Sequence, residues 1–76
     1  MAVGKGPHLA ERDYFIDYPI EEVMFRWDHE AGVAYRRFYG EAGLAAVEQA
    51  DRLWNEALAY GDEVDERAFR TGKPRA

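Results

Sequence analysis

Aromatic residues are concentrated in one part of this 76-residue chain, and this concentration constrains the fold more than any other feature. The eight aromatic side chains between positions 14 and 39 are Tyr14, Phe15, Tyr18, Phe25, Trp27, Tyr35, Phe38 and Tyr39. Each of them can bury roughly 150–250 Å². The chain has no cysteine, so no disulfide can compensate for a small core. We therefore expect a single domain, residues 1–76, that collapses around this aromatic segment.

A β-hairpin is the favoured interpretation of the aromatic segment. Val23, Phe25 and Trp27 fall at every second position, which is the period of a strand. Residues 28–32 have the composition of a turn, with aspartate first and glycine last. Residues 33–39 then resume a run rich in β-branched and aromatic side chains. Because a short loop that ends in glycine commonly joins two antiparallel strands, the pattern predicts a hairpin.

A helix is the alternative for the first half of this segment. Four apolar side chains have the spacing i, i+3, i+4 and i+7, namely Ile20, Val23, Met24 and Trp27. Pro19 suits the first turn of such a helix. We favour the hairpin because residues 33–39 have no helical stripe. The sequence alone leaves open whether residues 20–27 form a strand or a helix.

A long helix is expected over residues 41–60. Its apolar stripe has helical spacing and consists of Leu44, Val47, Ala50, Leu53, Trp54, Ala57 and Leu58. Glu48 and Arg52 are four residues apart in the order that favours a helical ion pair. Gly61 is well placed to end the helix.

The rest of the chain is expected to add one short helix and two loose ends. Asp62 is a candidate N-cap for a helix over residues 62–70. Residues 1–12 are expected to form a loose N-terminal segment, and residues 71–76 a disordered basic tail.

These elements predict an α+β fold. A small antiparallel β-hairpin or three-stranded sheet over residues 14–39 is packed by the long helix over 41–60 and the short C-terminal helix over 62–70. The alternative architecture, which follows from the helical interpretation of residues 20–27, is an all-α three-helix bundle.

The composition excludes the common forms of covalent catalysis and offers no metal site. The chain has no serine and no cysteine, and its one threonine is Thr71, so Ser-His-Asp and Cys-His arrangements are excluded. His29 lies between Asp28 and Glu30 in the expected turn, where adjacent side chains rarely converge on one ion. We therefore expect no enzyme activity, no cofactor and no metal.

The expected hairpin lies between two parts of the chain, residues 1–22 and 40–76, that each carry a net charge of −3. The whole chain has a net charge of −5, whereas residues 23–39 contain three arginines against two acids. Tyrosine and arginine are the residue types that most often dominate the binding energy of protein interfaces. The predicted partner-binding residues are therefore Arg26, Tyr35, Arg36, Arg37 and Tyr39.

A non-enzymatic protein-interaction module is the predicted function. We expect its partner to be a second copy of the chain, giving a homodimer, or a larger protein of which it is an accessory subunit. The alternative is a small nucleic-acid-binding regulator that uses the hairpin, although the overall acidity disfavours phosphate binding. The third class, a small enzyme or ligand carrier, requires a pocket. The sequence contains no run of about 18 apolar residues, so we expect no membrane-spanning helix. We expect a cytoplasmic location because no apolar signal segment follows the first residues.

Overall fold

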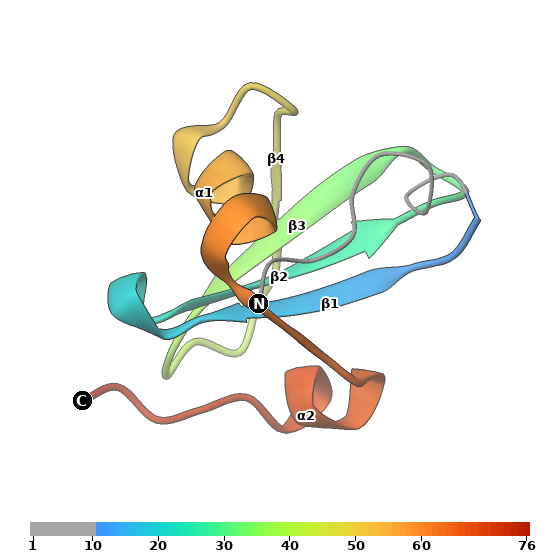
Figure 1. The fold of residues 1–76 in the computed structure, drawn as a ribbon. Coiled ribbons are helices and arrows are strands. Elements are labelled where there is room, and N and C mark those ends of the chain that lie inside the picture. The colour runs from blue at the N-terminus through green and yellow to red at the C-terminus, as the bar shows by residue number, and fades with distance from the viewer. Residues whose placement is uncertain (1–10) are drawn as a thin grey trace.

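The computed structural model describes residues 11–76, which form a five-stranded antiparallel sheet with two short helices. The strands are β1 (Tyr14–Tyr18), β2 (Val23–Asp28), β3 (Val33–Phe38), β4 (Ala45–Val47) and β5 (Asp62–Val64). The helices are α1 (Arg52–Tyr60) and α2 (Glu66–Thr71), and a 3-10 turn, η2 (Pro19–Glu21), joins β1 to β2. The strand order is β4-β3-β2-β1-β5, so β4 and β5 are the two edges of the sheet (Figure 1).

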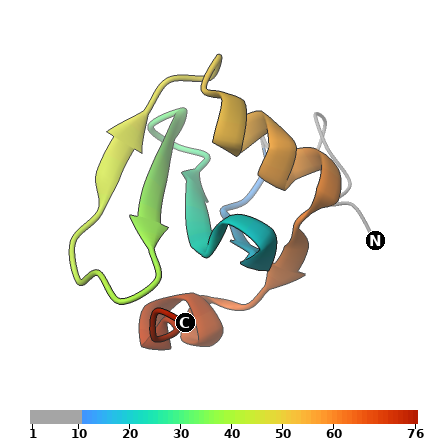
Figure 2. The same cartoon turned by 90° about the vertical axis from the view of Figure 1, so that its left-hand side faces the viewer.

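The two helices lie on opposite faces of the sheet (Figures 1 and 2). Successive side chains of a strand point to opposite faces, so each central strand contributes to both layers. On β1, for example, Ile16 belongs to the core under α1, whereas Phe15 packs against the core under α2.

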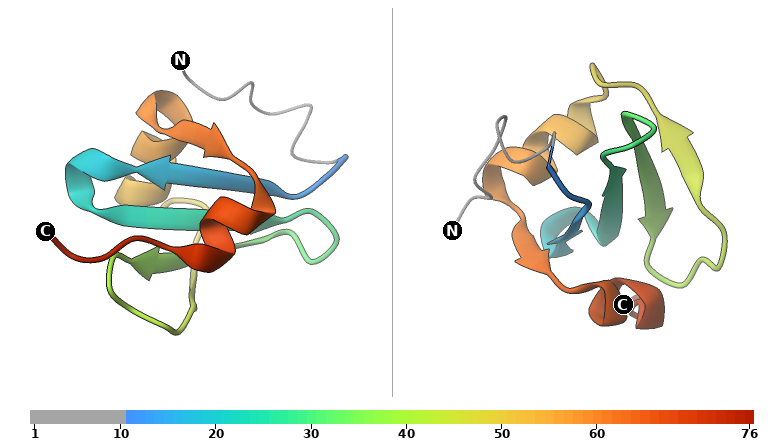
Figure 3. Two further views of the ribbon diagram at one scale, coloured as in Figure 1. Left: turned by 90° about the horizontal axis from the view of Figure 1, so that it is seen from below. Right: turned by 90° about the vertical axis from the view of Figure 1, so that its right-hand side faces the viewer.

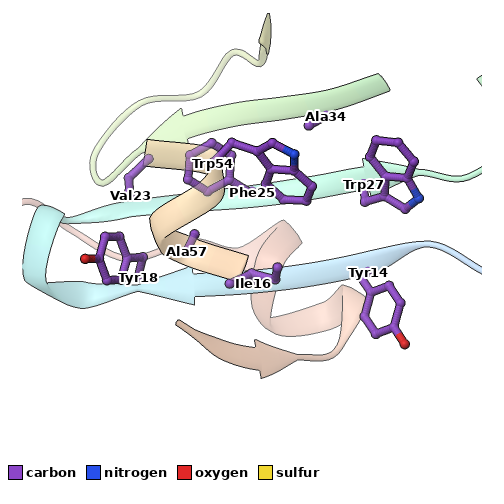
Figure 4. Packing of buried hydrophobic residues seen from close by; sticks show 9 residues of the cluster. All are labelled: Tyr14, Ile16, Tyr18, Val23, Phe25, Trp27, Ala34, Trp54 and Ala57. Atoms are coloured by element: carbon purple, nitrogen blue, oxygen red, sulfur yellow. The ribbon is translucent and has the colours of Figure 1, made fainter. Parts of the chain in front are cut away.

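The larger core, which we call the α1-side core, fills the space between α1 and the sheet (Figure 4). Its buried members are Tyr14, Ile16, Tyr18, Val23, Phe25, Trp27, Ala34, Trp54 and Ala57. Trp54 of α1 is stacked on Trp27, with ring centroids 5.9 Å apart and an interplanar angle of 12°. The same indole is tilted against Phe25 at 5.5 Å. The aromatic segment therefore supplies most of the surface that α1 covers.

A smaller core, the α2-side core, lies on the opposite face of the sheet. It consists of Met24, Tyr39 and Phe69, with Phe15 and Val64 packed against it. The rings of Phe15 and Phe69 are 5.4 Å apart. Phe69 thus anchors the six-residue helix α2, which is too short to be stable by itself.

The hairpin is present as β2 and β3, and residues 23–28 are strand rather than helix. Gly32 closes its turn with a φ of 68°, and the Gly32 amide donates to the Asp28 carbonyl at 2.8 Å. The α+β class is broadly consistent with this architecture. The three-helix bundle is wrong, and a sheet of two or three strands is an underestimate because five strands are present.

The long helix predicted over 41–60 is also wrong, because only residues 52–60 are helical. Ala45–Val47 instead pair with β3, which places Ala45 opposite Arg36 and Val47 opposite Ala34. The N-cap of the helix is Asp51, whose carboxylate accepts a hydrogen bond from the Trp54 amide at 3.0 Å.

The helix predicted over 62–70 is shorter than expected for a similar reason. Residues 62–64 form strand β5 beside β1, with Val64 opposite Phe15. The N-cap is Asp65 rather than Asp62, and its carboxylate accepts from the Ala68 amide at 2.8 Å.

Both chain ends were predicted to be loose, and the structure describes the C-terminal end in full but only residues 11 and 12 of the N-terminal segment. Most of the N-terminal segment, residues 1–10, lies outside the described residues, while Arg12 forms an ion pair with Glu63 at 3.0 Å. The C-terminal residues, predicted as a disordered tail, run back along the sheet toward η2 (Figure 3). The Lys73 carbonyl accepts from the Gly40 amide at 2.9 Å, and the Ala76 amide donates to the Glu22 carboxylate at 3.0 Å.

Candidate functional site

The sheet divides the predicted partner-binding residues between its two faces. Arg26 lies opposite Tyr35 in the β2–β3 ladder, and both face the α2 side together with Arg37. Arg36 lies opposite Phe25, a member of the α1-side core, so its side chain is on the other face. The five residues therefore do not form one contiguous patch on a single face.

Arg26 is oriented by Asp13, which precedes β1 and also contacts His29, the residue that follows β2. Its guanidinium donates to Asp13 Oδ2 at 3.0 Å, while Asp13 Oδ1 accepts from the His29 backbone amide at 2.9 Å and lies 2.7 Å from His29 Nδ1. Partial burial raises the pKa of Asp13, but the hydrogen bonds from His29 and Arg26 outweigh burial and lower it to about 2. Asp13 is thus a carboxylate at neutral pH and fixes the orientation of Arg26, which is 36% exposed.

Arg37 fastens helix α2 to the sheet. Its guanidinium lies over the Phe69 ring, 4.7 Å from the centroid, and donates a hydrogen bond to the Phe69 carbonyl. A cation over an aromatic face is stabilised by the ring quadrupole. Arg37 is therefore already engaged within the fold.

Tyr39 lies in the core, with 8% of its surface exposed. Its hydroxyl donates to Asp17 Oδ1 at 2.6 Å, and Lys73 Nζ donates to Asp17 Oδ2 at 2.5 Å. Burial and then the hydrogen bond to Asp17 raise the pKa of Tyr39 well above its ordinary value. The hydroxyl thus remains protonated and joins β1 to the residue that follows β3.

Tyr35 and Arg36 make fewer contacts within the fold than the other three residues do. Both are half-buried, and both lie beside the edge strand, Tyr35 opposite Ala46 and Arg36 opposite Ala45. The Arg36 guanidinium is 5.1 Å from the centroid of the Phe38 ring, and it has no ion pair among residues 11–76. Of the five predicted residues, these two are the best placed to meet a partner.

A groove separates α2 from the loop between β3 and β4. It consists of two adjoining hollows of about 580 and 280 Å³, and both are lined by Arg37, Ala42 and Arg70. Arg70 pairs with Glu66 at 2.5 Å within α2. Within the described part of the chain, no group of three or more histidines and acids is arranged to hold a metal ion. The lining of the groove thus combines arginine and lysine side chains with two glutamates, Glu41 and Glu66, and apolar side chains.

Sequence reasoning missed the surface formed by Leu44, Ala45 and Ala46. The helical spacing of Leu44 with later residues assigned it to a buried stripe, yet Leu44 is 45% exposed and both alanines are exposed. The sequence feature that could have revealed this surface is the uninterrupted non-polar run over 42–47. A helix on the surface of a protein needs a polar side, and this run provides none.

Neither helix of residues 11–76 has the length and apolar character needed to cross a membrane.

Comparison with known proteins identifies relatives over nearly the whole chain. Residues 1–73 match the family described as Tis1 immunity protein. The chain is 46% identical over 76 residues to the immune protein Tis1 of Pseudomonas aeruginosa (strain UCBPP-PA14), with 99% of each chain covered. It also resembles a chain in the crystal structure of the complex between the type VI effector Tas1 and its immunity protein. The TM-score is 0.92 at 43% identity, with 99% of this chain and 100% of that chain covered.

These findings correct the expected partner. We expected a second copy of the chain or a larger protein, but the related complex joins an immunity protein to a distinct protein, an effector. The expectation of a homodimer is therefore wrong. The findings support the coarser functional prediction, a protein of the interaction class, and they replace the alternative of a nucleic-acid-binding regulator.

Proposed function

Because the chain belongs to the Tis1 immunity protein family, we propose that it is the immunity protein of a type VI effector related to Tas1 and neutralises that effector by binding it. The observation that carries this proposal is the likeness to the structure of an effector–immunity complex, which extends over 99% of the chain at 43% identity. A protein that protects by binding needs a complementary surface and no catalytic group. The proposed activity is accordingly stoichiometric and non-enzymatic, and its proposed location is the cytoplasm.

The proposed contact residues are Tyr35 and Arg36. Tyrosine and arginine side chains that become fully desolvated are the usual energetic centres of an interface. Arg26 lies opposite Tyr35 and is oriented by Asp13, so we place it at the rim of the same interface. Arg37 and Tyr39 are proposed to act indirectly, by holding α2 and the C-terminal residues against the sheet.

The proposal is tested by co-expressing the chain with the Tas1-related effector from the same genome. We expect the effector alone to arrest growth and the chain to restore it. Light scattering of the co-purified proteins is expected to give the mass of one effector and one immunity protein. If growth is not restored and no complex forms, the proposed function is wrong.

Two substitutions locate the contact surface. Tyr35→Ala and Arg36→Glu are each expected to weaken effector affinity at least about tenfold, as loss of a hot-spot side chain does. The matched control is Arg67→Glu, which makes the same charge change on exposed helix α2. If Arg36→Glu and Tyr35→Ala bind the effector as tightly as the wild type does, Tyr35 and Arg36 are not contact residues and the interface lies elsewhere.

A further inference from the structure

The two edges of the sheet are built in opposite ways. Edge strand β5 contains Asp62 and Glu63 and is followed by two more acids, and Glu63 is ion-paired with Arg12. Charged side chains on an edge strand are a common protection against pairing with another chain. Edge strand β4 contains only Ala45, Ala46 and Val47, without a charge or a proline. One edge is therefore protected and the other is not.

The unprotected edge lies within an exposed apolar run. All five residues from 42 to 46 are exposed, and Leu44 is one of three large apolar side chains that are exposed among residues 11–76. Several consecutive exposed apolar residues are unfavourable in a soluble protein unless they serve a function. In the strand order β4 is the end member, and the views in Figures 2 and 3 show no described element on its outer side.

The small size of the β4 side chains lets the next strand reach past them. Arg36 lies opposite Ala45 on one face, and Tyr35 lies opposite Ala46 on the other. Alanine has no atom beyond Cβ, so the longer side chains of β3 can contact a strand placed outside β4. Arg36 has no carboxylate partner among the described residues, so a partner strand with an acidic side chain on that face would complement it.

We propose that the effector adds an extended strand to β4, residues 45–47, and enlarges the sheet to six strands. Main-chain hydrogen bonds along an exposed edge are a known mode of recognition, in which alternate side chains give specificity. The added strand carries a carboxylate beside Arg36 and apolar side chains beside Leu44 and Tyr35. This inference rests on the proposed function and specifies where and how the effector is bound.

Lysine substitutions on the edge test the inference. Ala45→Lys and Ala46→Lys each place a charge on β4, and we expect both to weaken affinity for the Tas1-related effector at least about tenfold in calorimetry. The control is Ala59→Lys, which adds the same charge on exposed α1 and is expected to leave affinity unchanged. Unchanged far-UV circular dichroism and melting temperature identify the variants as folded. An equal loss in the control would overturn the inference, because it would reflect charge alone.

Hydrogen exchange gives an independent test that needs no substitution. In the complex we expect the outward-facing amides of residues 45–47 to exchange at least about tenfold more slowly than in the free protein, because they donate to the added strand. Unchanged exchange at these residues in a formed complex, or wild-type affinity of both lysine variants, would overturn the inference and leave the proposed function intact. No complex with the wild type would overturn both.

The carboxylate is tested separately. Arg36→Gln is expected to weaken affinity about three- to tenfold, whereas Arg67→Gln on α2 is expected to have no effect. Equal affinities of these two variants would overturn the assignment of an acidic side chain to the added strand.

Discussion

Asp17 is the residue on which the α2 side of the molecule depends. Only 3% of it is exposed, yet its carboxylate carries two charge-assisted contacts, from the Tyr39 hydroxyl at 2.6 Å and from Lys73 Nζ at 2.5 Å. These contacts join β1, the end of β3 and the residues after α2. A buried carboxylate is tolerated only when its oxygens are satisfied in this way.

Replacing Asp17 is expected to destabilise the protein strongly. Asp17→Ala leaves the buried Tyr39 hydroxyl without an acceptor, so we expect the free energy of unfolding to fall by about 2–4 kcal/mol. Urea denaturation measures this change. Glu21→Ala, at an exposed position, is the control and is expected to change stability by less than about 0.5 kcal/mol. Equal effects of the two substitutions would show that the Asp17 contacts contribute no stability.

The depressed pKa of Asp13 makes a pH-dependent contribution. A carboxyl group with a folded pKa of about 2 stabilises the fold fully above its unfolded value of about 3.9, and this stability is lost as the pH falls toward 2. We expect the free energy of unfolding of Asp13→Asn at pH 7 to be about 1–2 kcal/mol lower than that of the wild type. The difference is expected to shrink between about pH 4 and pH 2. A difference that stays constant with pH would contradict this account.

The elements that the sequence predicted correctly are those whose pattern is local. The hairpin follows from the alternation of Val23, Phe25 and Trp27 and from the turn that ends at Gly32. Residues 45–47 were misassigned because Leu44 and Val47 have helical spacing with the apolar residues that follow them. Their pairing with β3 is a tertiary contact that this spacing does not reveal, and the true N-cap, Asp51, lay inside the predicted helix.

The candidate site was less predictable than the hairpin. Composition pointed to tyrosines and arginines, but the contacts that hold Tyr39 in the core and bind Arg37 to α2 are made with Asp17 and Phe69, which are 22 and 32 residues away. Such distant partners leave no local pattern in one sequence. Tyr35 and Arg36 remain as candidates because their neighbours on β4 are small.

The close approach between α1 and β1 depends on Gly61. A Cβ atom at this position would lie 2.7 Å from the Ala57 carbonyl oxygen and 2.7 Å from Ile16 Cγ2. We expect Gly61→Ala to lower the free energy of unfolding by about 1–3 kcal/mol through overpacking. Gly43→Ala is the matched control, because a Cβ there has no atom within 4 Å, and we expect a change below about 0.5 kcal/mol. Urea titrations that gave the same midpoint for both variants would refute the steric explanation.

At the scale of the whole molecule, two cores share one sheet. Strands β1 and β2 contribute to both, for example through Phe25 on the α1 side and Met24 on the α2 side. Both tryptophans belong to the α1-side core. Their fluorescence therefore reports on one face of the sheet, while far-UV circular dichroism reports on the whole backbone.

This arrangement predicts a single cooperative unfolding transition. Phe69→Ala removes the anchor of α2, and we expect it to cost about 3 kcal/mol. Although both indoles lie on the opposite face, the transitions followed by tryptophan fluorescence and by circular dichroism should shift together to lower denaturant. A fluorescence midpoint that stayed at the wild-type value while the circular dichroism midpoint moved would show that the α2 side unfolds independently.

The unequal edges of the sheet also limit how large an assembly can grow. A β-sheet polymerises when each added strand presents a new open edge and the opposite edge is open as well. Here the acids of β5 close one end, so the array is terminated on that side from the start. Growth at β4 ends as soon as the outer edge of an added strand is covered by the rest of its own protein. The fold can therefore present a reactive edge without acting as the repeating unit of a fibre.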